Sequence, residues 1–354
     1  MKTKRVLITG GNGFLGEHLV SYLLDKVDVG IVIFDKLKQQ ENYQNSKRVI
    51  SVNGDICSKD DIVKVFKDFG PFDTVYHLAS AMPDKSHNAD ETWNISVQGT
   101  MNMVSAAVKY KSKSFIFTSS NVTYGVPESL PVTEDTPLRP IEIYGKSKAQ
   151  AERELEKYKG KIYIQIFRCP VITGVGRLGL QAILFEFISE HKNVYVLGDG
   201  SNTYQFVDAD DVAQALEQAS HKKRFDIYTI GGDGATSLRQ LYQNVITYAK
   251  STSKIVSLPQ GPALLVLSLL NTLNISPLGV YQYSMIGQSM YADTTKIKKN
   301  LGWNPKKTIT QSFIENYLWY LRHKKDFRKL GSGRLSSNKS LPKMGIFTLL
   351  KYIS

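Results

Sequence analysis

Thr9-Gly10-Gly11-Asn12-Gly13-Phe14-Leu15-Gly16 is a glycine-rich stretch close to the start of this 354-residue chain. An apolar run, residues 6–8, precedes it, and leucines at helical spacing follow it as far as residue 24. Glycines in such a loop allow a tight turn, close approach of the backbone to a pyrophosphate and close packing of helix on strand, while the helix N-terminus offers free N–H groups. The order strand, loop, helix therefore favours a dinucleotide phosphate site over a simple glycine-rich turn.

Apolar runs and amphipathic segments alternate along the next hundred residues. Strands are predicted over residues 29–35, 49–53, 74–80 and 114–120, and helices over residues 60–69 and about 91–110. The run 29–35 is continuously apolar, which is typical of a parallel strand covered on both faces. Because strands and helices of this length alternate, we expect βαβ units and an α/β fold with a parallel sheet.

Asp35 closes the second predicted strand, about 20 residues beyond the glycine loop. A carboxylate at this place can accept hydrogen bonds from the ribose hydroxyls of a bound adenosine, or it can simply end the strand. Because a carboxylate repels a 2′-phosphate, Asp35 favours NAD over NADP, although the adjacent Lys36 weakens that preference. NAD is therefore the predicted cofactor.

Tyr144 and Lys148 lie on a predicted helix, and because they are four residues apart they share one face of it. A tyrosine phenol, with a reference pKa of about 10, is a poor base at neutral pH, but a neighbouring ammonium and a cationic nicotinamide favour the phenolate. Tyr144 could then exchange a proton with a substrate hydroxyl during hydride transfer, and Ser120, at the end of its strand, could hold the same oxygen. Tyr-x-x-x-Lys also occurs on ordinary helix surfaces, so it is the glycine loop and the hydroxyl-ended strand that favour catalysis here.

The net charge of +13 is unevenly distributed along the chain. From residue 322 onward there are nine lysines and arginines against the single acidic residue Asp326, which places roughly +8 of the charge in this last stretch. The rest of the chain is only mildly basic and contains no recognised nucleic-acid module. We therefore expect a basic, flexible tail over residues 326–354 and no nucleic-acid partner.

Two cysteines, Cys57 and Cys169, give neither a disulfide framework nor a metal-binding spacing. The basic N-terminus lies too close to the glycine loop to be a signal peptide. These features predict a cytoplasmic protein without a metal site.

Taken in order, the motifs resemble those of the extended short-chain dehydrogenase/reductase family, in its NAD-dependent epimerase/dehydratase branch. The resemblance runs to about Arg322 and rests on the glycine loop together with Gly54-Asp55-Ile56, His77-Leu78-Ala79-Ser80, Thr118-Ser119-Ser120, Tyr124-Gly125, Tyr144-Gly145-Lys146-Ser147-Lys148, Phe167-Arg168-Cys169-Pro170, and residues 206–213 and 301–306. These motifs are specific for the family and much less specific for the substrate.

The resemblance implies a set of site residues. Ser120, Tyr144 and Lys148 would be catalytic, and Lys148 would also reach the nicotinamide ribose. The cofactor would be held by Gly10, Gly13, Phe14, Leu15 and Gly16 at the pyrophosphate, Asp35 at the ribose, Asp55 and Ile56 at the adenine, and Leu78, Ala79, Tyr144, Lys148 and Pro170 along its path.

The resemblance also implies a Rossmann-type doubly wound parallel sheet with a smaller α/β substrate-binding domain. Residues 1–170 with about 204–232 would form the NAD-binding domain, and about 171–203 with 233–325 the substrate-binding domain. We further expect a homodimer.

Three departures from the family pattern bear on the reaction. Sugar-nucleotide 4,6-dehydratases carry an acidic pair directly after the catalytic hydroxyl residue, and nucleotide-sugar decarboxylases an acid at the second of these places, but this chain has Asn121 and Val122 there. Many epimerases bind the substrate pyrophosphate through an Arg at the place of Tyr204. Ser96 replaces an Asn found in the helix after the fourth strand, with Asn94 nearby.

No charged residue occurs between residues 255 and 292. The apolar run 263–270 is too short to span a membrane, so we expect a buried or pocket-lining helix. The alternatives are a membrane-facing patch and a pocket for an apolar substrate such as a sterol-like alcohol. The apolar end of the tail, residues 345–353, is a candidate for weak membrane-surface contact.

The sequence thus predicts an NAD-dependent epimerase of a nucleotide sugar, which oxidises a ring hydroxyl transiently to a ketone and returns the hydride to the other face. A dehydrogenase or reductase that uses NAD(P) on a hydroxysteroid-like or other apolar alcohol is the alternative, favoured by the uncharged stretch and by Tyr204. A nucleotide-sensing protein without catalysis is a third reading, which the intact Ser120, Tyr144 and Lys148 disfavour.

Overall fold

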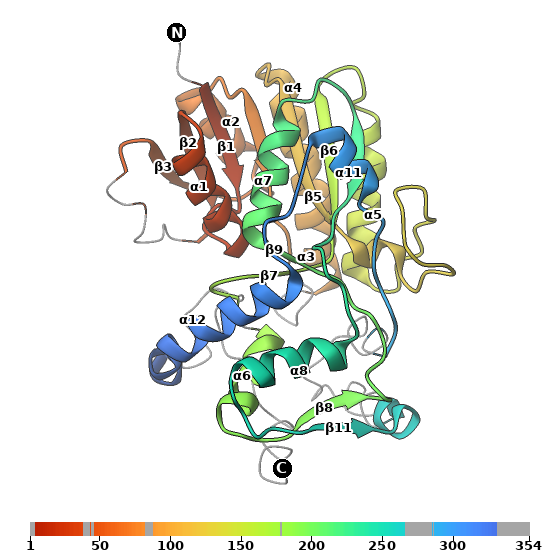
Figure 1. The fold of residues 1–354 in the computed structure, drawn as a ribbon. Helices are drawn as coiled ribbons and strands as arrows, with labels where there is room; N and C mark the ends of the chain where they lie inside the picture. Colours follow the sequence, from red (N-terminus) through yellow and green to blue (C-terminus); the bar gives the residue numbers. More distant parts are fainter. Residues whose placement is uncertain are drawn as a thin grey trace.

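A seven-stranded parallel sheet forms the centre of the molecule (Figure 1). The computed structural model describes residues 4–37, 43, 46–81, 88–177, 179–265, 285 and 287–330, the last five of these by their backbone alone. In spatial order the strands are β10 (Asp226–Thr229), β6 (Tyr163–Cys169), β5 (Ser114–Ser120), β4 (Thr74–His77), β1 (Lys4–Thr9), β2 (Val29–Asp35) and β3 (Val49–Asn53). Strand order reverses between β1 and β4, and parallel sheets of this kind bind ligands at the carboxyl ends of the strands near such a point.

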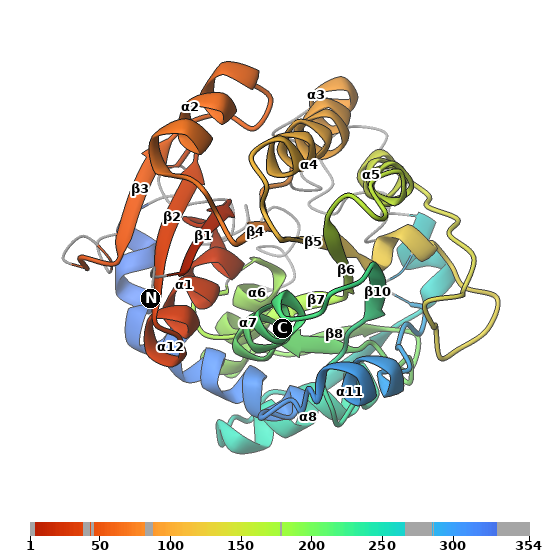
Figure 2. The ribbon, with the colours of Figure 1, turned by 90° about the horizontal axis from the view of Figure 1, so that it is seen from above.

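Helices cover both faces of the sheet (Figure 2). One face is covered by α1 (Phe14–Lys26), α7 (Ala209–Ser220) and α11 (Thr295–Leu301), and the other by α2 (Lys59–Phe69), α4 (Gly99–Lys109) and α5 (Ile143–Glu156). Successive residues of β1 enter opposite cores, since Val6 and Ile8 pack on the first face and Leu7 on the second. Both faces of the inner strands are therefore buried, which explains their continuous apolar sequence. The predicted Rossmann-type parallel sheet is confirmed.

A second group of elements lies at the carboxyl ends of the sheet strands (Figure 1). It comprises α6 (Gly179–Ser189), β8 (Val194–Leu197), α8 (Leu238–Tyr248), β11 (Ile255–Leu258) and α12 (Ile309–Leu330). β8 pairs with β11, and apolar side chains from the three helices form a separate core. β7 (Val171–Thr173) pairs with β9 (Phe206–Asp208), and this pair joins segments that the sequence assigns to different domains. The division into two domains stays a prediction.

The structure corrects the bounds of three predicted segments. The strand predicted over residues 74–80 ends at His77, because its neighbour β1 ends at Thr9, where the glycine loop begins. The helix predicted over residues 91–110 consists of α3 (Ala89–Trp93), a π-helical turn η2 (Asn94–Gln98) and α4, since the N–H after the turn donates to a carbonyl five residues earlier. Residues 326–330, predicted to belong to the tail, are instead helical, because α12 continues to Leu330.

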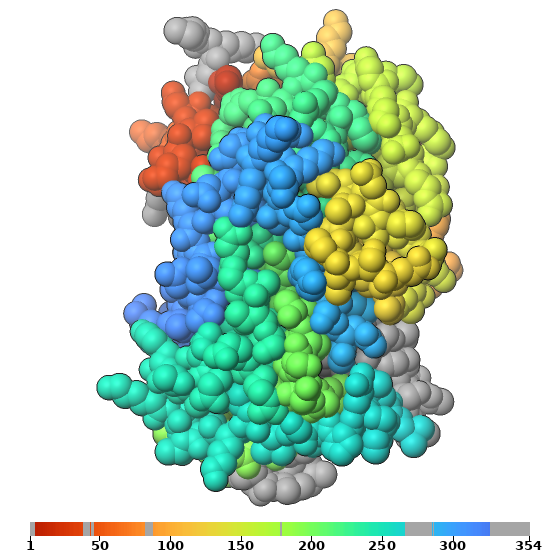
Figure 3. Space-filling model, turned by 45° about the vertical axis from the view of Figure 1, so that its right-hand side comes forward, coloured from red at the N-terminus to blue at the C-terminus, as the bar shows by residue number. Residues whose placement is uncertain are grey.

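The proline-rich loop 126–141 lies on the surface, shown in yellow in Figure 3, beside residues of the segment that precedes α11 (blue). The Val132 N–H donates to the Tyr291 carbonyl at 2.9 Å, and the Asp293 N–H donates to the Val132 carbonyl at 2.9 Å. These backbone bonds attach the loop that follows β5 to the segment that directly precedes α11.

No helix in the described part of the chain is both long enough and apolar enough to cross a membrane. Residues 266–284, which include most of the uncharged stretch, lie outside the described residues, as does the tail from residue 331. The pocket-lining helix and the membrane-contacting tail therefore stay predictions.

Candidate active site

The glycine loop between β1 and α1 lies so close to other backbone atoms at Gly10 and Gly16 that neither position has space for a side chain. Gly10 has a φ of +71°, and a Cβ atom there would lie 2.7 Å from the backbone nitrogen of Ala79. A Cβ atom on Gly16 would collide with the Gly10 carbonyl oxygen and lie 2.5 Å from Gly11 Cα. Gly13 is the N-cap of α1 and has no side chain that could accept a hydrogen bond from the first N–H groups of the helix. This backbone cradle fits the pyrophosphate of a dinucleotide.

Asp35 lies at the carboxyl end of β2, next to this loop. Its Oδ2 accepts the Asn12 N–H at 2.9 Å, and its Oδ1 accepts the Leu37 N–H at 2.9 Å. Burial raises the pKa of Asp35 and outweighs these N–H donors, which lower it. Each carboxylate oxygen keeps a second lone pair, so the side chain can also accept hydrogen bonds from a ribose.

Asp55 and Ile56 follow β3 at the same edge of the sheet. Lys36 Nζ forms an ion pair with Asp55 Oδ2 at 2.8 Å. Burial raises the pKa of Asp55, but donors from Lys36 and Cys57 outweigh burial and lower the pKa below its usual value. Ile56 is buried against Gly99, where a Cβ atom would lie 2.7 Å from Ile56 Cδ1. The two residues predicted at the adenine therefore follow a strand at the same edge of the sheet as Asp35, and Asp55 binds the lysine adjacent to Asp35.

The end of β4 faces the glycine loop from the other side. The Ala79 N–H donates to Thr9 Oγ1 at 3.3 Å, and both Leu78 and Ala79 are half-buried. His77 is buried between Thr9 and Thr100, with ring nitrogens 2.7 and 3.0 Å from their hydroxyls. Burial lowers the pKa of His77 to about 3, so its ring is neutral and serves packing.

Tyr144 and Lys148 share one face of α5, as their spacing predicts. Lys148 Nζ lies 6.0 Å from the centre of the Tyr144 ring and donates to the Thr118 carbonyl at 2.8 Å. Burial lowers the pKa of Lys148 to about 8, while the Cys169 thiol and the Glu152 carboxylate oppose this effect. Near neutral pH the lysine is therefore charged but close to its titration range.

Tyr144 lies in the first turn of α5. The Glu142 carboxylate fixes this turn by accepting the N–H groups of Tyr144 and Gly145, both at 2.8 Å. Burial raises the pKa of Tyr144 to about 12, and the Ser80 hydroxyl and the Arg177 charge act in the opposite direction. The phenol is protonated at neutral pH, so it needs nearby positive charge to act as a base.

Ser120 is the last residue of β5 and is half-buried. Its Oγ accepts the Val122 N–H at 3.4 Å and so caps the short helical turn η3 (Asn121–Tyr124). α5 packs against η3 and against β5. The structure thus brings the three predicted catalytic residues to the same end of β5.

Four further residues that the sequence did not single out as site residues belong to this region, namely Ser80, Arg177, Glu152 and Arg168. The Arg177 guanidinium lies 5.2 Å from the centre of the Phe14 ring, and burial lowers its pKa to about 10. Glu152 follows Lys148 by about one helical turn, and this spacing is the sequence signal that could have identified it.

Residues 6–231 match the model of a protein family described as the NAD dependent epimerase/dehydratase family. The chain belongs to this family. It is 34% identical over 352 residues to an uncharacterized protein of Sinorhizobium fredii, y4nG, covering 99% of this chain and 86% of the relative. It is 31% identical over 248 residues to a putative UDP-glucose 4-epimerase of Methanocaldococcus jannaschii, covering 67% and 80%. The fold resembles that of the Bordetella bronchiseptica enzyme WbmG in complex with NAD and UDP, with a TM-score of 0.75, 20% identity and coverage of 91% and 95%.

Membership of the NAD dependent epimerase/dehydratase family confirms the prediction of an NAD-dependent enzyme. Within the described ranges, no group of three His, Cys, Asp or Glu side chains is placed to hold a metal ion. Cys57 and Cys169 are free thiols, and burial raises their pKa values to about 11 and about 12. Neither thiol is therefore a reactive nucleophile at neutral pH.

Pro170, predicted on the cofactor path, lines a small cavity of this epimerase/dehydratase family member. Asn121, Arg168, Gln205 and Thr229 also line it. Asn121 Nδ2 and Thr229 Oγ1 are buried and have no hydrogen-bond partner among the described residues.

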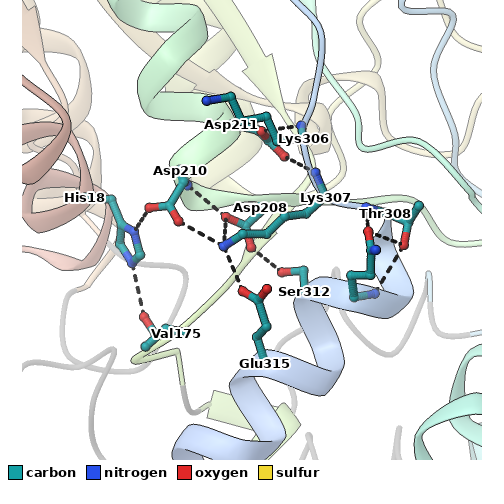
Figure 4. Close-up of polar contacts among 11 residues, drawn as sticks. His18, Val175, Asp208, Asp210, Asp211, Lys306, Lys307, Thr308, Ser312 and Glu315 are labelled. Carbon is teal, nitrogen blue, oxygen red and sulfur yellow. Dashed lines mark hydrogen bonds and ion pairs between the residues drawn. The ribbon is translucent and has the colours of Figure 1, made fainter. Parts of the chain in front are cut away.

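A cluster of charged residues links α1 of this family member to the second group of elements (Figure 4). His18 Nδ1 lies 2.6 Å from Asp210 Oδ1, and Nε2 lies 3.1 Å from the Val175 carbonyl oxygen. Because both ring nitrogens face acceptors, both can donate only when the ring is a cation. Burial lowers the pKa of His18, but Asp210 and the Val175 carbonyl outweigh burial and raise the pKa above 6.5. Lys307 extends the cluster through ion pairs with Asp208 (3.5 Å), Asp210 (3.0 Å) and Glu315 of α12 (2.8 Å).

Proposed function

We propose that this protein is an NAD-dependent epimerase of a nucleotide sugar, which oxidises a ring hydroxyl transiently to a ketone and returns the hydride to the opposite face. The observation that supports this most strongly is the grouping of Tyr144 and Lys148 on one face of α5, beside the end of β5 at which Ser120 lies. The 31% identity to a putative UDP-glucose 4-epimerase supports a nucleotide sugar as the substrate class.

The glycine loop and Asp35 form the proposed cofactor site. The backbone N–H groups at the start of α1 would bind the pyrophosphate, and the Asp35 carboxylate would accept hydrogen bonds from the adenosine ribose. When bound, NAD supplies an acceptor and a donor of hydride. The residues of the chain itself orient the substrate hydroxyl and move its proton.

Tyr144 is the proposed proton acceptor. Its pKa of about 12 keeps the proton on the phenol at rest, so the base form needs support from a neighbouring cation. Lys148, charged below its pKa of about 8, supplies that support from the same helix face. Ser120 would hydrogen-bond to the same substrate oxygen, and the phenol would return the proton when the ketone is reduced.

Asn121 and Val122 favour an epimerase over a dehydratase. Elimination of water requires an acid that protonates the leaving hydroxyl. The two positions that carry acids in 4,6-dehydratases here hold an amide and an aliphatic side chain, which are 5% and 8% exposed. Glu142, the carboxylate near Tyr144, caps α5 through two backbone N–H groups. These observations support return of hydride rather than loss of water.

Tyr204 supports the alternative, a dehydrogenase or reductase of an apolar alcohol. Tyr204 occupies the place at which many epimerases carry a substrate-binding Arg. Its ring packs against Phe206, with 5.5 Å between the ring centres. An aromatic side chain at this place offers apolar contact to a substrate rather than a positive charge.

The test is to purify the protein, identify the bound dinucleotide, and follow interconversion of sugar isomers by NMR with uridine, guanosine and thymidine diphosphate sugars. We expect interconversion without net NADH, and a loss of at least about 100-fold in turnover for Tyr144→Phe with NAD retained. Tyr163→Phe, at a tyrosine that is 40% exposed on β6, serves as the control and should be fully active. Oxidation of apolar alcohols with no interconversion across the panel would select the alternative.

The two-domain division and the homodimer are part of the same proposal. A division at the predicted boundaries should make the connections near residues 170, 204 and 232 the preferred sites of limited proteolysis. Light scattering measures whether the particle has twice the chain mass of 39.7 kDa.

A further inference from the structure

An ion pair between Glu152 and Arg168 is buried behind the proposed catalytic residues. We propose that this pair positions the helix of Tyr144 and Lys148 against the loop of Ser120, and that Glu152 keeps Lys148 charged. The inference rests on the proposed function for the roles of those three residues. It assigns to two further residues a positioning role and an electrostatic role.

The geometry of the pair is that of a guanidinium held on one carboxylate oxygen by two hydrogen bonds. Arg168 Nε lies 3.0 Å and Arg168 Nη2 2.9 Å from Glu152 Oε2. The two residues are only 4% and 3% exposed. Residues 144, 148 and 152 follow one another at four-residue spacing, so Glu152 lies on the same side of α5 as the catalytic pair.

Glu152 also ties α5 to β5 directly. Its Oε1 accepts a hydrogen bond from Ser119 Oγ, and Ser119 immediately precedes Ser120. In the sheet, Ser119 is the register partner of Arg168 on β6. One carboxylate therefore fixes the helix that carries Tyr144 relative to the strand that ends in Ser120.

Arg168 connects the pair to the turn that follows Ser120. Its Nη1 donates to Tyr124 Oη at 3.2 Å and to the Glu134 carbonyl at 2.8 Å. The guanidinium also lies 5.2 Å from the centre of the Tyr124 ring, and Tyr124 is the last residue of η3. The Arg168 guanidinium thus bonds both to Glu152 of α5 and to Tyr124 of η3.

Several groups determine the charge of Lys148. Phe117, Thr118 and His77 face it from β5 and β4, Cys169 from β6, and Tyr144 and Glu152 from its own helix. His77 and Cys169 are uncharged at neutral pH because burial lowers the pKa of the histidine to about 3 and raises that of the thiol to about 12. Glu152 is the carboxylate in this set, so it offsets the cost of a buried ammonium.

The two members of the pair should therefore shift the titration of Lys148 in opposite directions. Glu152→Gln removes a negative charge and leaves the Arg168 cation in place, so the Lys148 pKa should fall. Arg168→Gln leaves the negative charge in place, so the Lys148 pKa should rise. If the pair served packing alone, both variants would only destabilise the fold, and the Lys148 pKa would not move in opposite directions in the two proteins.

The experiment uses the NAD-loaded protein labelled with 13C at the lysine ε-carbons and follows the lysine signals by NMR between pH 6 and 10. Lys148→Met identifies the Lys148 signal. We expect its midpoint to fall by about one pH unit in Glu152→Gln and to rise by a similar amount in Arg168→Gln. The control is Glu154→Gln, because Glu154 lies on the same helix but pairs at the surface with Lys157, 2.7 Å away. Glu154→Gln should leave the midpoint unchanged.

Midpoints that stay fixed, or that move in the same direction in both variants, would overturn the inference.

The double variant Glu152→Gln/Arg168→Gln is the second test, to be used if a single variant fails to fold. It removes both charges together, so it leaves no unpaired charge. In that protein the Lys148 midpoint should lie between those of the single variants, and epimerase turnover should fall at least tenfold through lost positioning. A double variant with wild-type turnover contradicts the positioning role. Because the titration needs no substrate, it stays decisive even if the nucleotide-sugar panel fails.

Discussion

Gly16 and Gly30 show how differently two glycines of neighbouring elements constrain the chain. At Gly16 an added Cβ atom meets backbone atoms of the glycine loop, which cannot move without opening the proposed phosphate cradle. At Gly30 in β2 the nearest atom would be the Lys4 carbonyl oxygen at 3.8 Å, an ordinary contact. The first glycine is therefore required by close packing, whereas the second is not.

Gly16→Ala should weaken NAD binding by at least about tenfold and reduce the free energy of unfolding by about 1–3 kcal/mol, because the methyl group overpacks the loop. Gly30→Ala is the matched control and should retain NAD affinity. Isothermal titration with NAD and urea unfolding measure the two quantities. Equal NAD affinities in the two variants would contradict the proposed cradle.

Asp35 and Lys36 have opposite expected effects on the choice of cofactor, because Asp35 favours NAD and Lys36 favours NADP. Asp35 presents a carboxylate beside the loop, and Lys36, which could attract a 2′-phosphate, is bound by Asp55 at 2.8 Å. We expect Asp35→Ala to lower NAD affinity about tenfold, since a hydrogen bond to a charged group is lost. Asp55→Ala should instead release Lys36 and raise NADP affinity. Fluorescence titration with both dinucleotides checks this, and an Asp35→Ala protein with unchanged NAD affinity would sink the ribose assignment.

At the scale of elements, α1 is fastened to the second group through His18. The ring donates to Asp210 on α7 and to the Val175 carbonyl in the connection between β7 and α6. Since the pKa of His18 is raised in the folded protein, its contribution to stability is fully present below about pH 6.5, the unfolded value. The contribution is then lost as the pH rises through the folded-state pKa.

His18→Asn should therefore be less stable than the wild type by about 1 kcal/mol at pH 6, and the difference should shrink as the pH rises above 6.5. Urea unfolding at pH 6, 7 and 8.5 measures the difference. His221→Asn is the control, because His221 directly follows α7 and pairs at the surface with Glu217 of that helix. A His18→Asn deficit that grows with pH would have the wrong sign for a cationic ring.

At the scale of the whole molecule, the two groups of elements are joined by Lys307 as well as by the β7–β9 pair. Lys307 faces Asp208 and Asp210 at the start of α7 and Glu315 on α12. Asp208 is buried and also accepts a hydrogen bond from Ser312 Oγ of α12. The sheet and the second group are therefore held together by charge as well as by apolar packing.

Lys307→Met should lower the free energy of unfolding by about 1–2 kcal/mol, because buried Asp208 loses its cation. The adjacent Lys306→Met is the control, since the Lys306 side chain is exposed and its backbone N–H alone bonds to Asp211. Thermal unfolding monitored separately by tryptophan fluorescence and circular dichroism measures stability and cooperativity. If Lys307→Met matches the Lys306→Met protein, the cluster contributes nothing to joining the two groups.

Local patterns explain how much of the fold was predictable. The alternation of apolar strands and helices was predictable from the sequence, and the strand bounds 29–35 and 114–120 follow from burial on both faces of a parallel sheet. The bounds 49–53 were also predicted, although β3 is a partly exposed edge strand. The π-turn before Gly99 interrupts an otherwise continuous helical pattern and carries no separate signal in that pattern, and the early end of β4 could not be predicted because it depends on where β1 ends.

The glycine loop, the acidic end of β2 and the four-residue spacing of Tyr144 and Lys148 could all be predicted from the chain alone, because backbone conformation and helix periodicity are local properties. The charge environment of the site, in contrast, became visible only in the folded protein. The pKa of Lys148 near 8 comes from burial, and the Glu152–Arg168 pair joins α5 to a strand that begins only after that helix has ended. Desolvation and ion pairing depend on which segments meet in space, so spacing along the chain does not reveal them.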